Sequence, residues 1–112
     1  PRDLLQFDLA LYSEKFLSTK MKDEMFKGYS YERKGTRNYG LGMRMLEFET
    51  GQKYFFHNGW WHGNTASYVT LRKDSVTIIA ISNKFTRKPY QTKRLAPKFG
   101  DYPFKFNDEE GE

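Results

Sequence analysis

The residues best suited to chemistry lie together in one short segment near the middle of the chain. It reads His57-Asn58-Gly59-Trp60-Trp61-His62-Gly63 and stands between two runs of apolar, β-branched and aromatic residues. Histidine exchanges protons near neutral pH, an asparagine amide both donates and accepts hydrogen bonds, and glycine lets a ligand approach the backbone closely. The segment therefore predicts a hydrogen-bonding site where one strand ends and the next begins.

Each of these residues also has a plain structural interpretation. His57 could be a half-buried strand histidine without a catalytic role. Trp60 and Trp61 could either pack in a core or line an aromatic substrate groove. A metal site at His57 and His62 is disfavoured, because no carboxylate completes a ligand set nearby and the chain has no cysteine. We expect neither a metal nor another cofactor.

The runs around this segment predict an antiparallel sheet over residues 39–83. Residues 39–45 alternate apolar side chains with glycine and arginine, and a hairpin-turn composition at 49–52 leads into a strand at 53–57. Residues 66–72 and 76–82 are further β-branched and aromatic runs joined by a tight connection. We predict a meander of three or four strands, the last covered on both faces because it is almost continuously apolar.

Two short helices are predicted before the sheet, within residues 1–28. Asp3 can N-cap a helix over residues 4–12, with Gln6 at the capping-box position. Ser18 can open a second helix, and Gly28 stands where the end of that helix favours a positive φ.

After the sheet, residues 87–112 are predicted to form a short helix and an irregular tail. Pro89 suits the first turn of a helix over residues 90–95, and Pro97 interrupts regular structure beyond that helix. Residues 29–38 are polar and glycine-containing without a repeating period, which indicates a loop. At 112 residues the chain is a single domain of the α+β class.

The charge is positive overall and concentrated near the C-terminal end. The net charge is +5, and residues 84–98 contain six basic and no acidic side chains. We interpret that stretch as a solvated helix face, although it could attract phosphates or acidic lipids. A non-catalytic binding module for nucleic acid or peptidoglycan is an alternative, disfavoured function. Single-stranded nucleic acid would add stacking on the aromatic residues Tyr54, Phe55, Phe56, Trp60 and Trp61.

Four separated blocks together resemble one known family. They are residues 3–12, Tyr39-Gly40-Leu41-Gly42, His57-x-Gly59-x-x-x-Gly63 and Ile79-Ala80-Ile81-Ser82-Asn83. In order and spacing they are similar to the C-terminal part of class C β-lactamase-like and penicillin-binding-protein-like serine hydrolases. The third active-site motif of those proteins is Lys-Thr-Gly or His-x-Gly. The resemblance implies a partial β-lactamase/transpeptidase-like fold and suggests a periplasmic or extracytoplasmic location.

The resemblance also implies a role for each residue of the segment. His57 would replace the more usual lysine beside the nucleophile, Asn58 would hydrogen-bond a substrate carboxylate or amide, and Gly59 would keep the strand bare for substrate. The backbone N–H of Trp60 would be an oxyanion-hole donor, and Trp61 would contact the substrate. Histidine in place of lysine favours a peptidase or an esterase over a β-lactamase.

The other two catalytic motifs of that family are absent. None of the six serines is followed three residues later by lysine, and no tyrosine or serine begins a Tyr-x-Asn or Ser-x-Asn triplet. We therefore expect a fragment of a parent hydrolase of amides, esters or peptidoglycan-like substrates, inactive by itself. Its expected partner is the missing N-terminal part of the domain or another copy of the chain, either of which would cover an open sheet edge.

Overall fold

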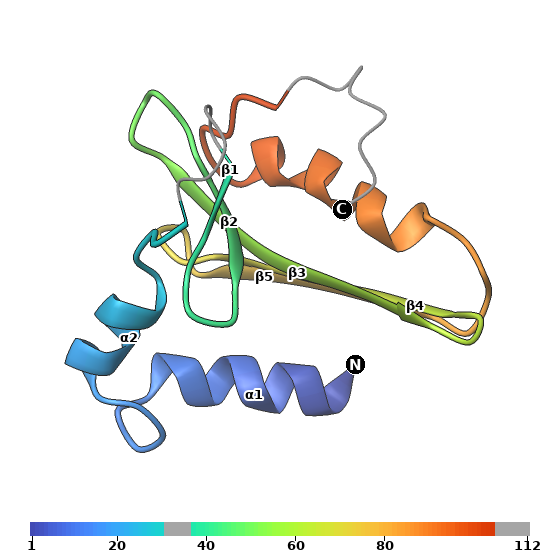
Figure 1. The fold of residues 1–112 in the computed structure, drawn as a ribbon, viewed down its shortest axis with the longest axis horizontal. Helices are drawn as coiled ribbons and strands as arrows, with labels where there is room; N and C mark the ends of the chain where they lie inside the picture. The colour runs from blue at the N-terminus through green and yellow to red at the C-terminus, as the bar shows by residue number, and fades with distance from the viewer. Residues whose placement is uncertain (31–36, 105–112) are drawn as a thin grey trace.

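An antiparallel sheet with helices on both faces forms the framework of the chain (Figure 1). The computed structural model describes residues 1–30 and 37–104. The sheet order is β1-β2-β3-β4-β5, so each strand pairs with its neighbours in sequence. The strands are β1 (Arg37–Tyr39), β2 (Arg44–Glu47), β3 (Lys53–Trp61), β4 (Asn64–Leu71) and β5 (Val76–Ser82). The helices are α1 (Arg2–Tyr12), α2 (Thr19–Met25) and the 3-10 helix η1 (Lys88–Lys98). The predicted α+β class is confirmed.

The five strands exceed the predicted three or four because residues 39–45 do not form one strand. Gly42 has a φ of 78°, and the Gly40 N–H donates to the Met43 carbonyl at 2.7 Å, which turns the chain back between β1 and β2. The alternation of glycine with apolar residues resembles the pattern of a strand. The positive φ of Gly42, however, does not occur in a regular strand. The predicted turn at 49–52 is confirmed, with Gly51 at a φ of 87°.

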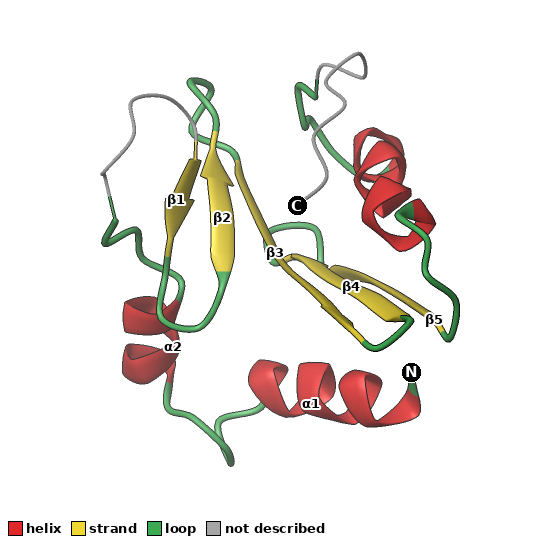
Figure 2. Ribbon diagram, turned by 45° about the vertical axis from the view of Figure 1, so that its right-hand side comes forward, coloured by secondary structure: helices red, strands yellow, loops and turns green. Residues whose placement is uncertain are grey.

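The two faces of the sheet carry separate cores, because successive strand side chains point to opposite faces. The core on the η1 side contains Tyr54, Val69, Leu71, Ala96 and Tyr102. The core on the side of α1 and α2 contains Met43, Met45, Phe55 and Tyr68. In Figure 2 the sheet lies between α1 and η1, as predicted for a last strand covered on both faces.

The predicted caps of the first helices are partly confirmed. Ser18 caps α2, since its hydroxyl accepts from the Met21 N–H at 3.2 Å. Asp3 does not cap α1, whose N-cap is Pro1; it lies in the first turn, where a carboxylate still favours the positive end of the helix dipole. Gly28 has no positive φ, so that prediction was wrong. Its small size matters instead, because a Cβ there would lie 2.3 Å from Asn38 Nδ2.

The C-terminal helix is longer than predicted. η1 begins at Lys88 with Pro89 in its first turn, as expected, but it continues through Pro97 and ends one residue later. Residues 101–104 have no regular structure, and the rest of the predicted tail lies outside the described residues. Of the predicted loop 29–38, residues 37 and 38 belong to β1, and residues 31–36 are not described. No helix among the described residues is long and apolar enough to cross a bilayer.

Candidate functional site

The segment singled out from the sequence occupies the far half of β3, which continues to Trp61 and does not end at residue 57 as predicted. In this half the strand has only one partner. β2 is four residues long and pairs with residues 53–56 of β3, whereas β4 pairs with residues 55–61. Within the described part of the chain, residues 57–61 are therefore held by β4 alone. The short β2 leaves a stretch of strand edge, directly after Phe56, that an extended ligand or another chain segment could pair with.

His57 is exposed and is held by Tyr39 at the end of β1. The Tyr39 hydroxyl lies 3.1 Å from His57 Nε2, and the two rings meet edge to face with centroids 6.5 Å apart. His57 Nδ1 lies 2.9 Å from the carbonyl oxygen of Asn58. A carbonyl can only accept, so Nδ1 carries the proton, and Nε2 of the neutral ring accepts from the Tyr39 hydroxyl. The imidazole is thereby fixed in one tautomer and orientation.

The register of the sheet places the end of β1 near His57. Tyr39 pairs with Arg44, and Arg44 pairs with Phe56, the residue before His57. The guanidinium of Arg44 also lies 5.4 Å from the centre of the Tyr39 ring. Sequence reasoning used Tyr39 only as part of a matching block and did not place it in the site. One sequence feature could have pointed to Tyr39: it stands at the end of a strand, directly before a glycine-rich turn.

Asn58 points to the opposite face of the sheet, toward η1. Its side chain is only 8% exposed, and Oδ1 has no hydrogen-bond partner among the described residues. Across the register it faces Ser67, whose hydroxyl lies 3.4 Å from that of Thr92 in η1. A buried amide oxygen without a donor costs about 1–3 kcal/mol. Asn58 thus retains one acceptor that another group can use.

Because glycine has no side chain, Gly59 leaves the surface of β3 uncovered, as the residue type suggested. A Cβ at Gly59 would have no atom within 4 Å, so the space above it is open. Its carbonyl oxygen accepts from the Tyr90 hydroxyl of η1 at 3.2 Å, a contact that the sequence did not indicate. The backbone of Gly59 is therefore held by η1, while the space that a side chain would occupy is open.

Trp60 and Trp61 are 64% and 70% exposed, so neither packs in a core of the described chain. They lead into a two-residue turn, in which His62 and Gly63 have φ values of 46° and 80°. Positive φ at both central positions is typical of the type I′ hairpin turn. The Trp61 ring also lies against His62, with centroids 4.6 Å apart. The hairpin thus projects two large aromatic surfaces beyond the His57 edge.

The aromatic residues proposed for nucleic-acid stacking do not share one surface. Tyr54 and Phe55 are 3% and 5% exposed and belong to the cores on opposite faces of the sheet. Only the two tryptophans of that set are well exposed. The stacking platform suggested by the sequence is therefore absent from the described part of the chain, although most basic side chains of 84–98 are exposed as predicted.

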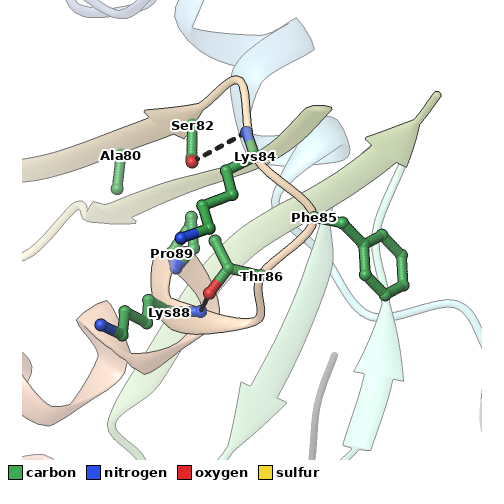
Figure 3. A pocket seen from close by; sticks show the side chains of 7 residues that line it. All are labelled: Ala80, Ser82, Lys84, Phe85, Thr86, Lys88 and Pro89. Atoms are coloured by element: carbon green, nitrogen blue, oxygen red, sulfur yellow. Dashed lines mark hydrogen bonds between the residues drawn. The ribbon is translucent and has the colours of Figure 1, made fainter. Parts of the chain in front are cut away.

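An open hollow of about 460 Å³ lies beside the site, between the end of β5 and the start of η1 (Figure 3). Thr65, which pairs with Trp60, donates to the Lys84 carbonyl at 3.4 Å and so places the hollow at the Trp60 end of the sheet. The hollow is lined by Ala80, Ser82, Lys84, Phe85, Thr86, Lys88 and Pro89. In Figure 3 the ring of Phe85 points away from the other side chains. Two lysines thus give the hollow a cationic lining.

Comparison with known proteins indicates a penicillin-binding-protein-like relationship. The chain is 28% identical over 89 residues to penicillin-binding protein 4* of Bacillus subtilis strain 168. The match covers 80% of this chain and 20% of that protein, so the chain spans about a fifth of the length of its relative. No protein-family model matches the chain. Among the described residues, no three histidine, cysteine, aspartate or glutamate side chains are grouped so as to hold a metal ion.

Proposed function

We propose that the chain is the C-terminal part of a serine hydrolase of the β-lactamase and penicillin-binding-protein type, and that β3 forms one wall of its acyl-transfer site. The observation that carries the proposal is the one-sided pairing of residues 57–61, which leaves this strand edge open, with His57 and Gly59 exposed on it. The similarity to a penicillin-binding protein supports the same reaction class.

In this proposal each residue has a chemical task. His57, oriented by Tyr39, accepts a hydrogen bond at Nε2 beside the nucleophile once a hydroxyl of the reacting groups takes the place of the Tyr39 hydroxyl there. The open space at Gly59 allows an extended substrate to lie against the strand, and the backbone N–H of Trp60 donates to the oxyanion of the tetrahedral intermediate. Trp61 offers an exposed face to the substrate.

The unpartnered oxygen of Asn58 has a matching role. It would accept a hydrogen bond when a substrate amide, or an adjoining segment of the complete site, approaches β3. Because the side chain is largely buried on the η1 side, this contact requires a donor that reaches between β3 and η1.

The chain alone should not catalyse the reaction. It lacks a Ser-x-x-Lys sequence, and a hydroxyl without an adjacent base is a weak nucleophile. We expect no turnover of a chromogenic β-lactam or a p-nitrophenyl ester by the 112-residue chain. Turnover abolished by His57→Ala would instead place a complete catalytic site within it.

A chimera provides the positive test. The matched fifth of penicillin-binding protein 4* would be replaced by this chain, and covalent labelling by a fluorescent penicillin would be measured. We expect labelling in the chimera and its loss by about 10-fold or more with His57→Ala. His62→Ala is the matched control, because His62 lies in the hairpin turn beyond the strand edge, and it should label normally. A folded chimera that is never labelled, or equal labelling of both variants, would contradict the proposal.

A further inference from the structure

The peptide unit that joins Gly59 to Trp60 has its two polar groups on opposite sides of β3. A trans peptide is planar, so its C=O and its N–H point in opposite directions across the strand. Gly59 pairs with Ala66 of β4 on one side, whereas no described strand pairs with residues 57–61 on the other. One of the two groups therefore faces β4, and the other faces the open edge.

The hydrogen bond that closes the hairpin before β3 determines which group faces which side. The Phe48 N–H donates to the Gln52 carbonyl at 2.9 Å, so the carbonyl of residue 52 points toward the side of β2. In an antiparallel ladder this direction alternates from one residue to the next, and the register of β3 is continuous with both neighbouring strands. Counting from Gln52, the Gly59 carbonyl points toward β4. The Trp60 N–H points toward the side of β2, where the edge is open.

A contact of His57 agrees with this alternation. By the same count the Asn58 carbonyl points toward the side of β1 and β2. His57 Nδ1 lies 2.9 Å from that carbonyl oxygen, while Nε2 of the same ring lies 3.1 Å from the hydroxyl of Tyr39 in β1. The Asn58 carbonyl and the Trp60 N–H thus face the same open edge, beside His57.

Tyr90 of η1 binds the same peptide unit at its other end. The Tyr90 hydroxyl donates to the Gly59 carbonyl oxygen at 3.2 Å. A C=O group that accepts a hydrogen bond polarises its peptide unit, which makes the N–H of that unit a stronger donor. The bond also opposes rotation of the peptide plane. Tyr90 therefore acts on both the strength and the direction of the Trp60 N–H.

The packing of η1 holds Tyr90 in place. Pro89, the preceding residue, is buried and restricts φ in the first turn of the helix. The Thr92 hydroxyl lies 3.4 Å from that of Ser67 in β4, and Ala96 is fully buried in the core on this face of the sheet. The half-buried Tyr90 is thus carried by a helix that is attached to β4 further along.

We propose that Tyr90 is a positioning residue for acyl transfer, because its hydrogen bond to the Gly59 carbonyl orients and polarises the Trp60 N–H that donates to the oxyanion. The inference rests on the proposed function, which assigns this N–H to the oxyanion hole. Tyr90 acts through one peptide unit and not by contact with the substrate. Negative charge develops on the substrate oxygen in the transition state, so a stronger donor accelerates acylation more than it strengthens binding.

The test uses Tyr90→Phe, which keeps the ring and removes only the hydroxyl, in the chimera with penicillin-binding protein 4*. At saturating fluorescent penicillin we expect the labelling rate constant to fall about 3- to 10-fold. The half-saturating penicillin concentration should stay the same. Tyr29→Phe is the matched control, since it also removes a hydroxyl that donates to a backbone carbonyl, that of Glu24 in α2 at 2.7 Å. It should label like the parent chimera, and circular dichroism would establish that both variants are folded.

Two spectroscopic measurements separate positioning from a general loss of structure. The carbonyl stretching frequency of the acyl-enzyme falls as hydrogen bonds to its oxygen strengthen, so Tyr90→Phe should raise that frequency and Tyr29→Phe should not. In the 112-residue chain alone, the amide proton resonance of Trp60 should move upfield in Tyr90→Phe, because its peptide unit is less polarised.

The outcomes distinguish this inference from the proposed function. A labelled parent chimera with an equal rate constant in Tyr90→Phe would overturn the role of Tyr90 and leave the proposed function standing. A higher half-saturating concentration with an unchanged rate constant would do the same, because it would assign Tyr90 to binding. An unchanged Trp60 amide resonance would show that the hydroxyl does not act on this peptide unit. A folded parent chimera that is never labelled would contradict the proposed function and this inference with it.

Discussion

The hydroxyl of Tyr68 in β4 donates a 2.6 Å hydrogen bond to the carboxylate of Asp8 in α1, although sixty residues separate them. Thr77 in β5 donates to the other oxygen of the same carboxylate at 2.8 Å. Asp8 is only 3% exposed, so α1 is anchored to two strands through one buried acid. Leu11 of the same helix is fully buried, and the Phe7 ring meets the Tyr68 ring edge to face with centroids 6.2 Å apart.

Removal of this anchor should destabilise the fold. Asp8→Ala leaves two hydroxyls without their acceptor, and we expect the free energy of unfolding to fall by about 2–4 kcal/mol in urea titrations. Asp3→Ala, an exposed carboxylate on the same helix, should cost less than about 1 kcal/mol. A double-mutant cycle with Tyr68→Phe should show coupling between the two sites. Additive losses would mean that the hydrogen bond contributes nothing of its own.

The buried tyrosines predict a loss of stability in alkali. Burial raises the pKa of Tyr54 and of Tyr68 above 10, and the hydrogen bond to Asp8 adds to the effect at Tyr68. The folded state then binds these protons more tightly than the unfolded state. The contribution is fully present below about pH 10, and the free energy of unfolding falls as the pH rises above it, by about 1.4 kcal/mol per pH unit for each group.

Two variants separate the contributions in urea titrations between about pH 8 and pH 11.5. Tyr54→Phe keeps the ring that packs against Phe56 and Phe104 but removes the titrating group, so the alkaline slope should become shallower with little change at the lower pH. Tyr68→Phe should also reduce the slope, but it should lower stability at the lower pH as well, because Asp8 loses a donor. An unchanged slope in both variants would exclude Tyr54 and Tyr68 as its cause.

Alanine substitutions of Gly59 and Gly40 should have different effects on the free energy of unfolding. Gly59→Ala should change the free energy of unfolding by no more than about 0.5 kcal/mol, because the added Cβ meets no atom within 4 Å. In the chimera with penicillin-binding protein 4* it should nevertheless reduce penicillin labelling, because the methyl group occupies the bare strand surface. Gly40→Ala should be clearly destabilising, since its Cβ would lie 2.5 Å from the Met25 carbonyl oxygen. A large loss of stability in Gly59→Ala, comparable with that of Gly40→Ala, would contradict this prediction.

Features that depend on neighbouring residues could be predicted from the sequence. The capping serine at position 18, the turn at 49–52, the strand at 76–82 and the proline at the start of η1 follow from local propensity and periodicity, and all four are confirmed. The same local reasoning failed at Gly40 and Gly42, where alternation imitated a strand although the chain turns. The roles of His57, Asn58, Gly59, Trp60 and Trp61 remain predictions from the resemblance.

Which residues meet across the molecule could be learned from the tertiary structure alone. The hydroxyl of Tyr39 lies 3.1 Å from His57 Nε2, 18 positions along the chain, and two successive strand pairings place the end of β1 near that part of β3. The burial of Asn58 depends on η1, and the open edges of β3 and β5 depend on which strands are short or last in the sheet. Strand pairing and burial are set by distant parts of the chain, so periodicity alone cannot specify them.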